Sequence, residues 1–155
     1  MKKYSLLFGV AVLMLFALKT AFATDPDVTV MQKEGIGKYL ADSKGRTLYW
    51  FKNDSPKKST CTGKCLELWI PFYNGAILSA SPEMNLKDFG TIVRQDGKKQ
   101  NTFRSYPLYY YYMDEQPGDT KGQNFNNLWH VVDPVKFRLT EKEYFGYSET
   151  KGTTK

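Results

Sequence analysis

The chain has 155 residues, with 22 Lys and Arg against 16 Asp and Glu, two cysteines and one histidine. Two cysteines are too few for a four-thiolate zinc site or a dense disulfide scaffold. Three of the lysines fall in the first 23 residues, which contain no acidic residue, so the other 132 residues carry a net charge of +3. This weak charge, without a long basic run, argues against nucleic-acid binding, and the length suits one domain with its own core.

The N-terminal segment has the order of a secretory signal. Lys2 and Lys3 form a short positive start, residues 4–18 are mostly apolar, and Ala21 and Ala23 supply small side chains at a cleavage site. We therefore expect residues 1–23 to be a signal peptide, cleaved near Ala23.

A membrane anchor is the alternative interpretation of the same segment. The apolar run is shorter than the roughly 20 residues that span a bilayer, and Lys19 interrupts it. No cysteine near the cleavage point could carry a lipid. We expect a mature chain without a membrane span, located in the periplasm or secreted, where disulfides are permitted.

Self-similarity is the strongest pattern in the rest of the chain. Residues 48–54 read LYWFKND and residues 108–114 read LYYYYMD, an offset of 60 residues that Trp69 and Trp129 share. Upstream, Gly37 aligns with Gly90.

The upstream alignment implies an insertion. The shift from Gly37 to Gly90 is 53 residues, so the second copy would carry seven extra residues, which we place within 95–104. We expect repeat one at about 36–72 and repeat two at about 89–134.

Most of both repeats has the pattern of short strands separated by turns. The expected strands are residues 39–41, 47–52, 91–94, 100–103 and 128–132. A hairpin is expected at Asp96-Gly97, because glycine accepts a positive φ without steric cost. Residues 61–69 have helical spacing for about two turns, and 81–88 form a turn-rich connection with Pro82.

Neither repeat is large enough to bury its own aromatic strand, whereas two repeats together are. The predicted fold is therefore mainly β, a single domain (24–147) of two pseudo-symmetric antiparallel repeats. It includes one short helix near Cys61–Trp69 and is followed by a flexible tail at 148–155.

Several blocks in order carry a family resemblance. The second copy reads RQDGKKQ at 94–100, PLYYY at 107–111, PGDTKGQ at 117–123 and WHVV at 129–132; the first reads STCTGKC at 59–65. This resembles the bacterial "secreted repeat of unknown function" family, described as predicted lipoproteins with a Y-x-(F/W/Y)-x-x-D motif.

The motif occurs once in each copy. Its residues are Tyr49, Phe51 and Asp54 in the first copy and Tyr109, Tyr111 and Asp114 in the second. The resemblance covers roughly residues 35–134 and implies an architecture and an exported location, but no reaction. The chain departs from the lipoprotein description because it has no cysteine to lipidate.

The aromatic strands present two rows of rings, because side chains alternate across a strand. One row is expected in the core: Tyr49, Phe51, Tyr109 and Tyr111. The other row would face outward as a candidate binding surface: Trp50, Tyr110 and Tyr112. The alternative for this second row is packing beneath a neighbouring loop.

Asp54 and Asp114 end these strands at equivalent positions. A carboxylate there can accept N–H bonds from the following turn, a structural role. Paired general acid–base chemistry is the alternative, and it requires the two carboxylates to lie close together.

Cys61 and Cys65 are expected to form a disulfide in an oxidising compartment. The alternative is a copper-binding or thiol–disulfide protein that uses both cysteines with His130, because thiolates and imidazole suit copper. Leu66 after the second cysteine excludes a c-type haem motif.

The sequence contains no G-x-S-x-G, H-E-x-x-H, P-loop or G-x-G-x-x-G motif. Trp69 and Trp129 are expected as matched core residues. We therefore expect no enzyme and no cofactor, but an exported module that binds an unknown protein, glycan or envelope component through the outward aromatic face. Electron transfer assisted by tyrosine and tryptophan is a further possibility, with no cofactor site to favour it.

Overall fold

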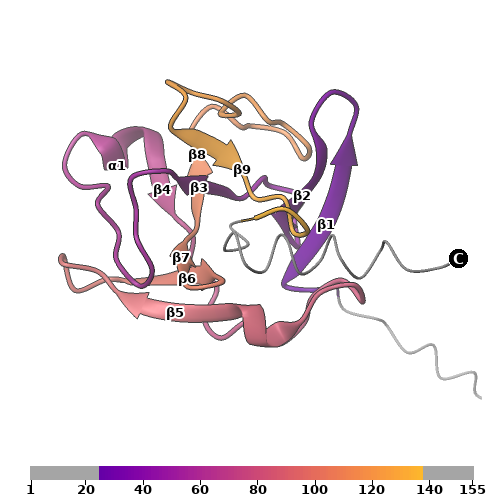
Figure 1. Cartoon of the computed structure of the whole chain (residues 1–155), viewed down its shortest axis with the longest axis horizontal. Helices are drawn as coiled ribbons and strands as arrows, with labels where there is room; N and C mark the ends of the chain where they lie inside the picture. Colours follow the sequence, from indigo (N-terminus) through magenta and orange to yellow (C-terminus); the bar gives the residue numbers. More distant parts are fainter. Residues whose placement is uncertain (1–24, 138–155) are drawn as a thin grey trace, which may run out of the picture.

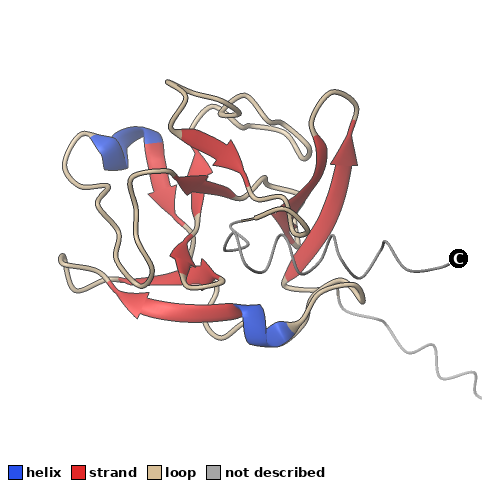
Figure 2. Cartoon of the chain, in the orientation of Figure 1, coloured by secondary structure: helices blue, strands red, loops and turns tan. Residues whose placement is uncertain are grey.

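Two β-hairpins flank a central four-stranded sheet in the computed structural model of this chain, which describes residues 25–137 (Figure 1). The strands are β1 Val28–Lys33, β2 Gly37–Asp42, β3 Tyr49–Phe51, β4 Trp69–Pro71, β5 Phe89–Val93, β6 Lys99–Phe103, β7 Tyr106–Pro107, β8 Tyr109–Tyr111 and β9 Trp129–Val131. The helical elements are α1 Cys65–Leu68 and the 3-10 turn η1 Leu86–Asp88. The predicted mainly β fold with one short helix is confirmed (Figure 2).

The central sheet interleaves the two repeats. Its strand order is β4-β8-β3-β9, and all pairs are antiparallel. The closing strand of the first repeat, β4, pairs with the aromatic strand β8 of the second, and β9 of the second repeat pairs with β3 of the first. Each repeat therefore completes the sheet of the other, and the two form one structure.

A hairpin begins each repeat. β1 and β2 form a two-stranded sheet, and β5, β6 and β7 form a three-stranded one. The predicted turn at Asp96-Gly97 is confirmed: Gly97 has a φ of +78°, and the side chain of Asp96 accepts a bond from the N–H of Lys98. The strand β1 was not predicted from the sequence.

The expected alignment of Gly37 with Gly90 is wrong. Gly37 begins β2, the second strand of its hairpin, whereas Gly90 lies in β5, the first strand of the other hairpin. Equivalent backbone bonds show the true correspondence: Leu40 N donates to Val132 O, and Asn101 N donates to Phe72 O. The seven-residue insertion disappears with that alignment.

The helix is shorter than the predicted stretch 61–69. Gly63 has a φ of +55°, which a right-handed helix cannot contain, so α1 begins only at Cys65 and has a single turn. None of the helices in residues 25–137 is long and apolar enough to cross a membrane. The expected signal peptide and the expected tail lie outside the described residues.

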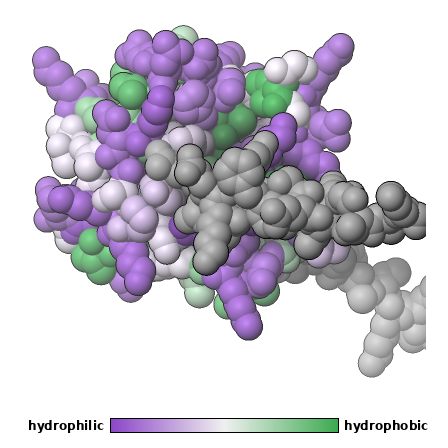
Figure 3. All heavy atoms as spheres, in the orientation of Figure 1, coloured by the Kyte–Doolittle hydropathy of each residue, from purple (hydrophilic) through white to green (hydrophobic). Residues whose placement is uncertain are grey.

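Two hydrophobic clusters occupy opposite faces of the central sheet. The first cluster contains Tyr49, Cys61, Trp69, Tyr109, Tyr111, Trp129 and Val131, with Phe51 packed against it. The second contains Val28, Leu40, Leu48, Phe72, Phe103, Leu108, Val132 and Phe137, with Trp50 and Tyr110 packed against it. Because neighbours along β3 and β8 enter different clusters, both faces of the sheet are covered. On the coloured part of the face shown in Figure 3, hydrophilic side chains predominate and apolar ones are scattered.

Candidate functional site

The two family motifs bond to each other rather than within themselves. Tyr49 Oη donates to Asp114 Oδ2 at 2.6 Å, and Tyr109 Oη donates to Asp54 Oδ2, also at 2.6 Å. The tyrosine of each repeat therefore reaches the aspartate of the other. The sequence predicted both tyrosines in the core but not this exchange of partners.

The second oxygen of each aspartate holds the turn that follows its strand. Asp54 Oδ1 accepts from the N–H and hydroxyl of Thr60, at 2.7 and 2.9 Å, and Asp114 Oδ1 accepts from Lys121 N at 2.9 Å. Burial raises the pKa of both carboxyl groups, while the hydrogen bonds from Tyr109 and Tyr49 oppose the rise. The geometry matches the structural role expected for these aspartates.

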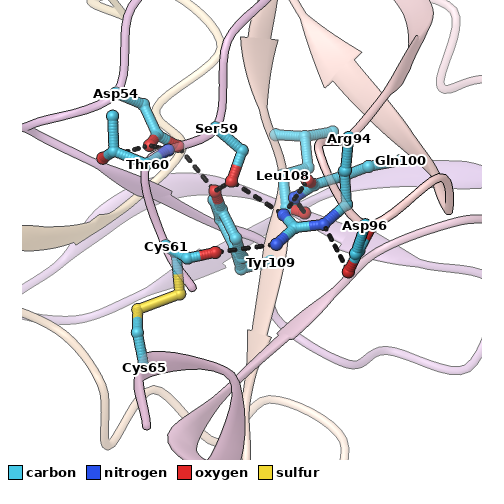
Figure 4. Close-up of a disulfide and its surroundings, with 10 residues drawn as sticks. All are labelled: Asp54, Ser59, Thr60, Cys61, Cys65, Arg94, Asp96, Gln100, Leu108 and Tyr109. Atoms are coloured by element: carbon cyan, nitrogen blue, oxygen red, sulfur yellow. Dashed lines mark hydrogen bonds and ion pairs between the residues drawn. A yellow bond between two sulfur atoms is a disulfide. The ribbon is translucent and has the colours of Figure 1, made fainter. Parts of the chain in front are cut away.

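A buried arginine connects the cysteine loop to the second repeat (Figure 4). Arg94 Nη1 donates to Ser59 Oγ and Gln100 Oε1, at 2.7 and 2.6 Å, and Nη2 donates to Cys61 O at 2.7 Å. Asp96 Oδ2 lies 3.5 Å from its Nε. No sequence signal distinguished this arginine from a surface one, because it precedes an ordinary turn.

The network continues from Arg94 to the motif. Ser59 Oγ and Tyr109 Oη are hydrogen-bonded at 2.7 Å, and Gln100 Nε2 donates to Leu108 O at 2.7 Å. Ser59 is 8% exposed and Gln100 is fully buried. These polar atoms are therefore occupied by one another and not open to a substrate.

The predicted disulfide between Cys61 and Cys65 is confirmed, with the two Cα atoms 5.4 Å apart. Cys61 is buried in the first cluster. The disulfide closes a short loop at the start of α1. Arg94 donates a hydrogen bond to the carbonyl of Cys61 at the beginning of this loop.

His130 is not brought to the cysteines. It pairs with Trp50 across β9 and β3, whereas its neighbours Trp129 and Val131 enter the first cluster together with Cys61. His130 therefore faces the other side of the sheet. No group of three His, Cys, Asp or Glu side chains within residues 25–137 is arranged to hold a metal, so the alternative copper set of Cys61, Cys65 and His130 is not assembled.

The expected outward row of rings requires a correction. The ring of Tyr110 packs edge-on against Phe72 and lies beneath the Arg46 guanidinium, 3.7 Å from its centroid, while its hydroxyl donates to Asp42 Oδ2 at 2.7 Å. Tyr110 therefore serves the second cluster. For Tyr110, the alternative stated above holds: the ring packs beneath neighbouring segments of the chain and does not face outward.

Trp50 and Tyr112 differ from Tyr110 and from each other. Trp50 is partly buried, with Phe137 edge-on at 5.2 Å and His130 at 5.5 Å between ring centroids. Tyr112 is 50% exposed and contacts Tyr111 of the first cluster. The three rings do not form one free row, because the segments that cover the second face come from distant parts of the chain.

A hollow of about 230 Å³ opens beside Trp50. Its lining residues are Ile36, Trp50, Gln123, Val131, Asp133, Lys136 and Phe137. Four of them are apolar or aromatic and three are polar or charged. We call this feature the Trp50 hollow.

Two of the polar side chains that line the Trp50 hollow, Gln123 and Asp133, are anchored in the fold. Gln123 Oε1 accepts from Val131 N at 2.8 Å, and Asp133 Oδ1 accepts from the N–H groups of Val135 and Lys136 at 2.9 and 3.0 Å. These bonds fix the directions of the remaining amide and carboxylate atoms.

The profile of a family described as "secreted repeat of unknown function" matches residues 30–72 and 90–133. The chain belongs to this secreted-repeat family. The two matched stretches are nearly equal in length, which agrees with the absence of a seven-residue insertion. Neither the search of curated proteins nor that of solved structures gave a significant match.

The secreted-repeat family description agrees with an exported chain. The first matched stretch begins at residue 30 and so includes most of β1, earlier than the expected start at 36. The tyrosine and the aspartate of the family motif form the hydrogen bonds that join one repeat to the other.

Proposed function

We propose that this secreted-repeat protein is an exported binding module and not an enzyme, and that it holds one ring of a glycan in the Trp50 hollow. The observation that carries the proposal is the position of Trp50, the one tryptophan outside the first cluster, in the wall of an open hollow. An aromatic wall with a few directed polar groups is the usual composition of a small-molecule site.

The size and chemistry of the hollow suit a single ring. Its volume of about 230 Å³ is below the roughly 300–1,000 Å³ of sites for drug-sized ligands. An indole face packs against the C–H face of a ring, while Asp133, Lys136 and Gln123 offer polar partners to hydroxyl and amide groups. A neutral, hydroxyl-rich ring uses both kinds of contact.

The buried polar network supports a binding role over catalysis. Arg94, Ser59, Tyr109 and Asp54 include the reactive side-chain types of many enzymes, but here their polar atoms bond to each other within the core. These hydrogen bonds connect the first repeat to the second.

Tryptophan fluorescence tests the proposal directly. Trp69 and Trp129 are 1% and 4% exposed and stack on each other at 3.8 Å, so a ligand that changes the emission acts on Trp50. We expect short N-acetylglucosamine oligomers, used as neutral glycan probes, to shift that emission in a saturable way.

Two variants locate the binding. Trp50→Phe keeps an aromatic ring against Phe137 but shortens the stacking face, and we expect about tenfold weaker binding by calorimetry. Tyr112→Ser, at a half-exposed ring elsewhere, is the matched control and should bind normally. Unchanged affinity in a folded Trp50→Phe protein, or no response to a panel of neutral glycans, would overturn the proposal.

A further inference from the structure

A second hollow lies on the β5-β6-β7 sheet and shares no lining residue with the Trp50 hollow. Its volume is about 300 Å³. The lining residues are Lys57, Lys87, Asp88, Phe89, Gly90, Thr91, Ile92, Thr102, Arg104 and Ser105. We propose that this basic hollow binds an anionic group, a phosphate or a carboxylate, carried by an envelope polymer.

Charge is the first argument. Lys57, Lys87 and Arg104 are cations, and Asp88 is the one acid of the lining. Asp88 is already engaged, because Arg104 Nε lies 3.3 Å from its Oδ2. Neither lysine takes part in an ion pair within residues 25–137, so the hollow keeps a net positive charge of two that an anion can neutralise.

The backbone that carries Lys57 and Arg104 is held in a defined conformation. Lys57 and the turn residues Arg104 and Ser105 have positive φ values of 62°, 46° and 70°. Lys57 N donates to Ser105 O at 2.7 Å, which fixes the lysine loop against the turn. The hollow is therefore formed in the absence of a ligand.

Arg104 is oriented with donors to spare. Its Nε lies against Asp88, and its Nη1 donates to Phe137 O at 3.2 Å. A guanidinium has five N–H donors in a fixed fork, so these two bonds leave donors for an oxyanion. An arginine held by a carboxylate and a carbonyl is a rigid partner for phosphate or carboxylate.

Gly90 is a lining residue of the hollow that has no side chain. It pairs with Thr102 across β5 and β6, and a Cβ at position 90 would lie 3.0 Å from Thr102 Oγ1. A side chain at this position would narrow the hollow without altering its charge. Gly90→Ala is therefore a test of shape that is separate from charge.

The experiment measures binding of labelled polymers to the purified protein by fluorescence anisotropy. Polyphosphate and polygalacturonate supply the two anionic chemistries, and dextran is the neutral control. We expect saturable binding of at least one polyanion, weakened by added salt, and none of dextran. Binding of polyphosphate alone assigns phosphate as the ligand group, binding of polygalacturonate alone assigns carboxylate, and binding of both assigns a general anion site.

Two double variants with the same change in net charge distinguish binding at this hollow from nonspecific attraction of a polyanion to the positively charged protein. Lys57→Gln with Lys87→Gln removes two exposed lysines of the hollow, and Lys38→Gln with Lys64→Gln removes two exposed lysines elsewhere. The first pair should weaken polyanion binding about tenfold or more, and the second less than about twofold.

Three results overturn the inference: no polyanion binds, both lysine pairs lose affinity equally, or Gly90→Ala with a native circular dichroism spectrum binds as tightly as the parent. All three are independent of neutral glycan binding at Trp50. Failure of this inference therefore leaves the proposed function standing, and the reverse is also true.

Discussion

Tyr49 on β3 lies directly opposite Tyr109 on β8, and the two phenols extend to aspartates of opposite repeats. This register places the pseudo-two-fold relation at the centre of the sheet. A repeat alone has a tyrosine without its acceptor and an aspartate without its donor. Each Y-x-(F/W/Y)-x-x-D motif therefore supplies one donor and one acceptor of a reciprocal pair of hydrogen bonds. The pair is complete only when two copies of the motif are present, as they are in this chain.

Removing the hydroxyl group of Tyr49 or of Tyr109 should destabilise the protein by about 1–3 kcal/mol, because a buried carboxylate then loses a charge-assisted hydrogen bond. We expect Tyr109→Phe to cost more than Tyr49→Phe, since the second bond of Tyr109, to Ser59 Oγ, is 2.7 Å long, whereas Tyr49 Oη accepts its second bond from Gly122 N at 3.3 Å. Urea denaturation measures both. Tyr112→Phe, at a half-exposed ring, is the control and should change little. Equal stability of all three variants would contradict the pairing.

Alkaline pH should unfold the protein through its buried tyrosines. Burial raises the pKa of Tyr49, Tyr109 and Tyr110 above the ordinary value of 10.0. The unfolded chain releases these protons near pH 10 while the folded chain keeps them, so stability is intact below that pH and falls as pH rises above it. Tyrosinate absorbance and circular dichroism should show these three phenols ionising together with unfolding. Their ionisation in the folded protein near pH 10 would refute the prediction.

Arg94 should be more costly to remove than the partly buried Arg46. Arg94→Met leaves Ser59, Gln100 and the Cys61 carbonyl without their donor, and each buried acceptor left unsatisfied in this way costs about 1–3 kcal/mol. By comparison, the disulfide closes a five-residue loop and contributes about 2 kcal/mol in the chain-entropy model.

The redox behaviour gives a second readout for Arg94. Because its guanidinium holds the Cys61 carbonyl, Arg94→Met should let a mild reductant open the disulfide faster, as measured by thiol titration. Arg46→Met, which removes a partly buried cation near Tyr110, is the control and should leave the reduction rate unchanged. Equal reduction rates would mean that Arg94 does not protect the loop.

Local patterns in the sequence were sufficient for the repeat itself and for most of its strands, but not for β1, β4 or β7. The alternation at 48–52 and 108–112 identifies two rows of rings, and Asp96-Gly97 identifies a hairpin. The same patterns carry no information on partners far along the chain. Tyr49 and Asp114 are 65 residues apart, so their bond was not predictable from spacing.

The prediction of an outward aromatic face was wrong for a related reason. Alternation shows that Trp50 and Tyr110 lie on the face opposite Tyr49, but it cannot show what covers that face. Phe72, at the end of the first repeat, and Phe137, just after the second, pack there, so the face expected at the surface is a second core. Likewise, Arg94 precedes an exposed turn and gives no local sign that its guanidinium is buried.

Gly122 should tolerate no side chain, because it lies against the stacked aromatic core. A Cβ at this position would approach Trp69 Cη2 at 2.8 Å and the Cβ and Cγ of Tyr111 at 3.0 Å. These atoms belong to the buried cluster in which Trp69 stacks on Trp129, so they cannot move aside without disturbing that stack. We expect Gly122→Ala to cost about 1–3 kcal/mol through overpacking. Ser43→Ala, in an exposed turn, adds no volume to the core and is the control. Thermal denaturation should show a clear drop in Tm for Gly122→Ala and a smaller one for Ser43→Ala; a parent-like Tm for Gly122→Ala would mean that the aromatic stack is looser than its contacts indicate.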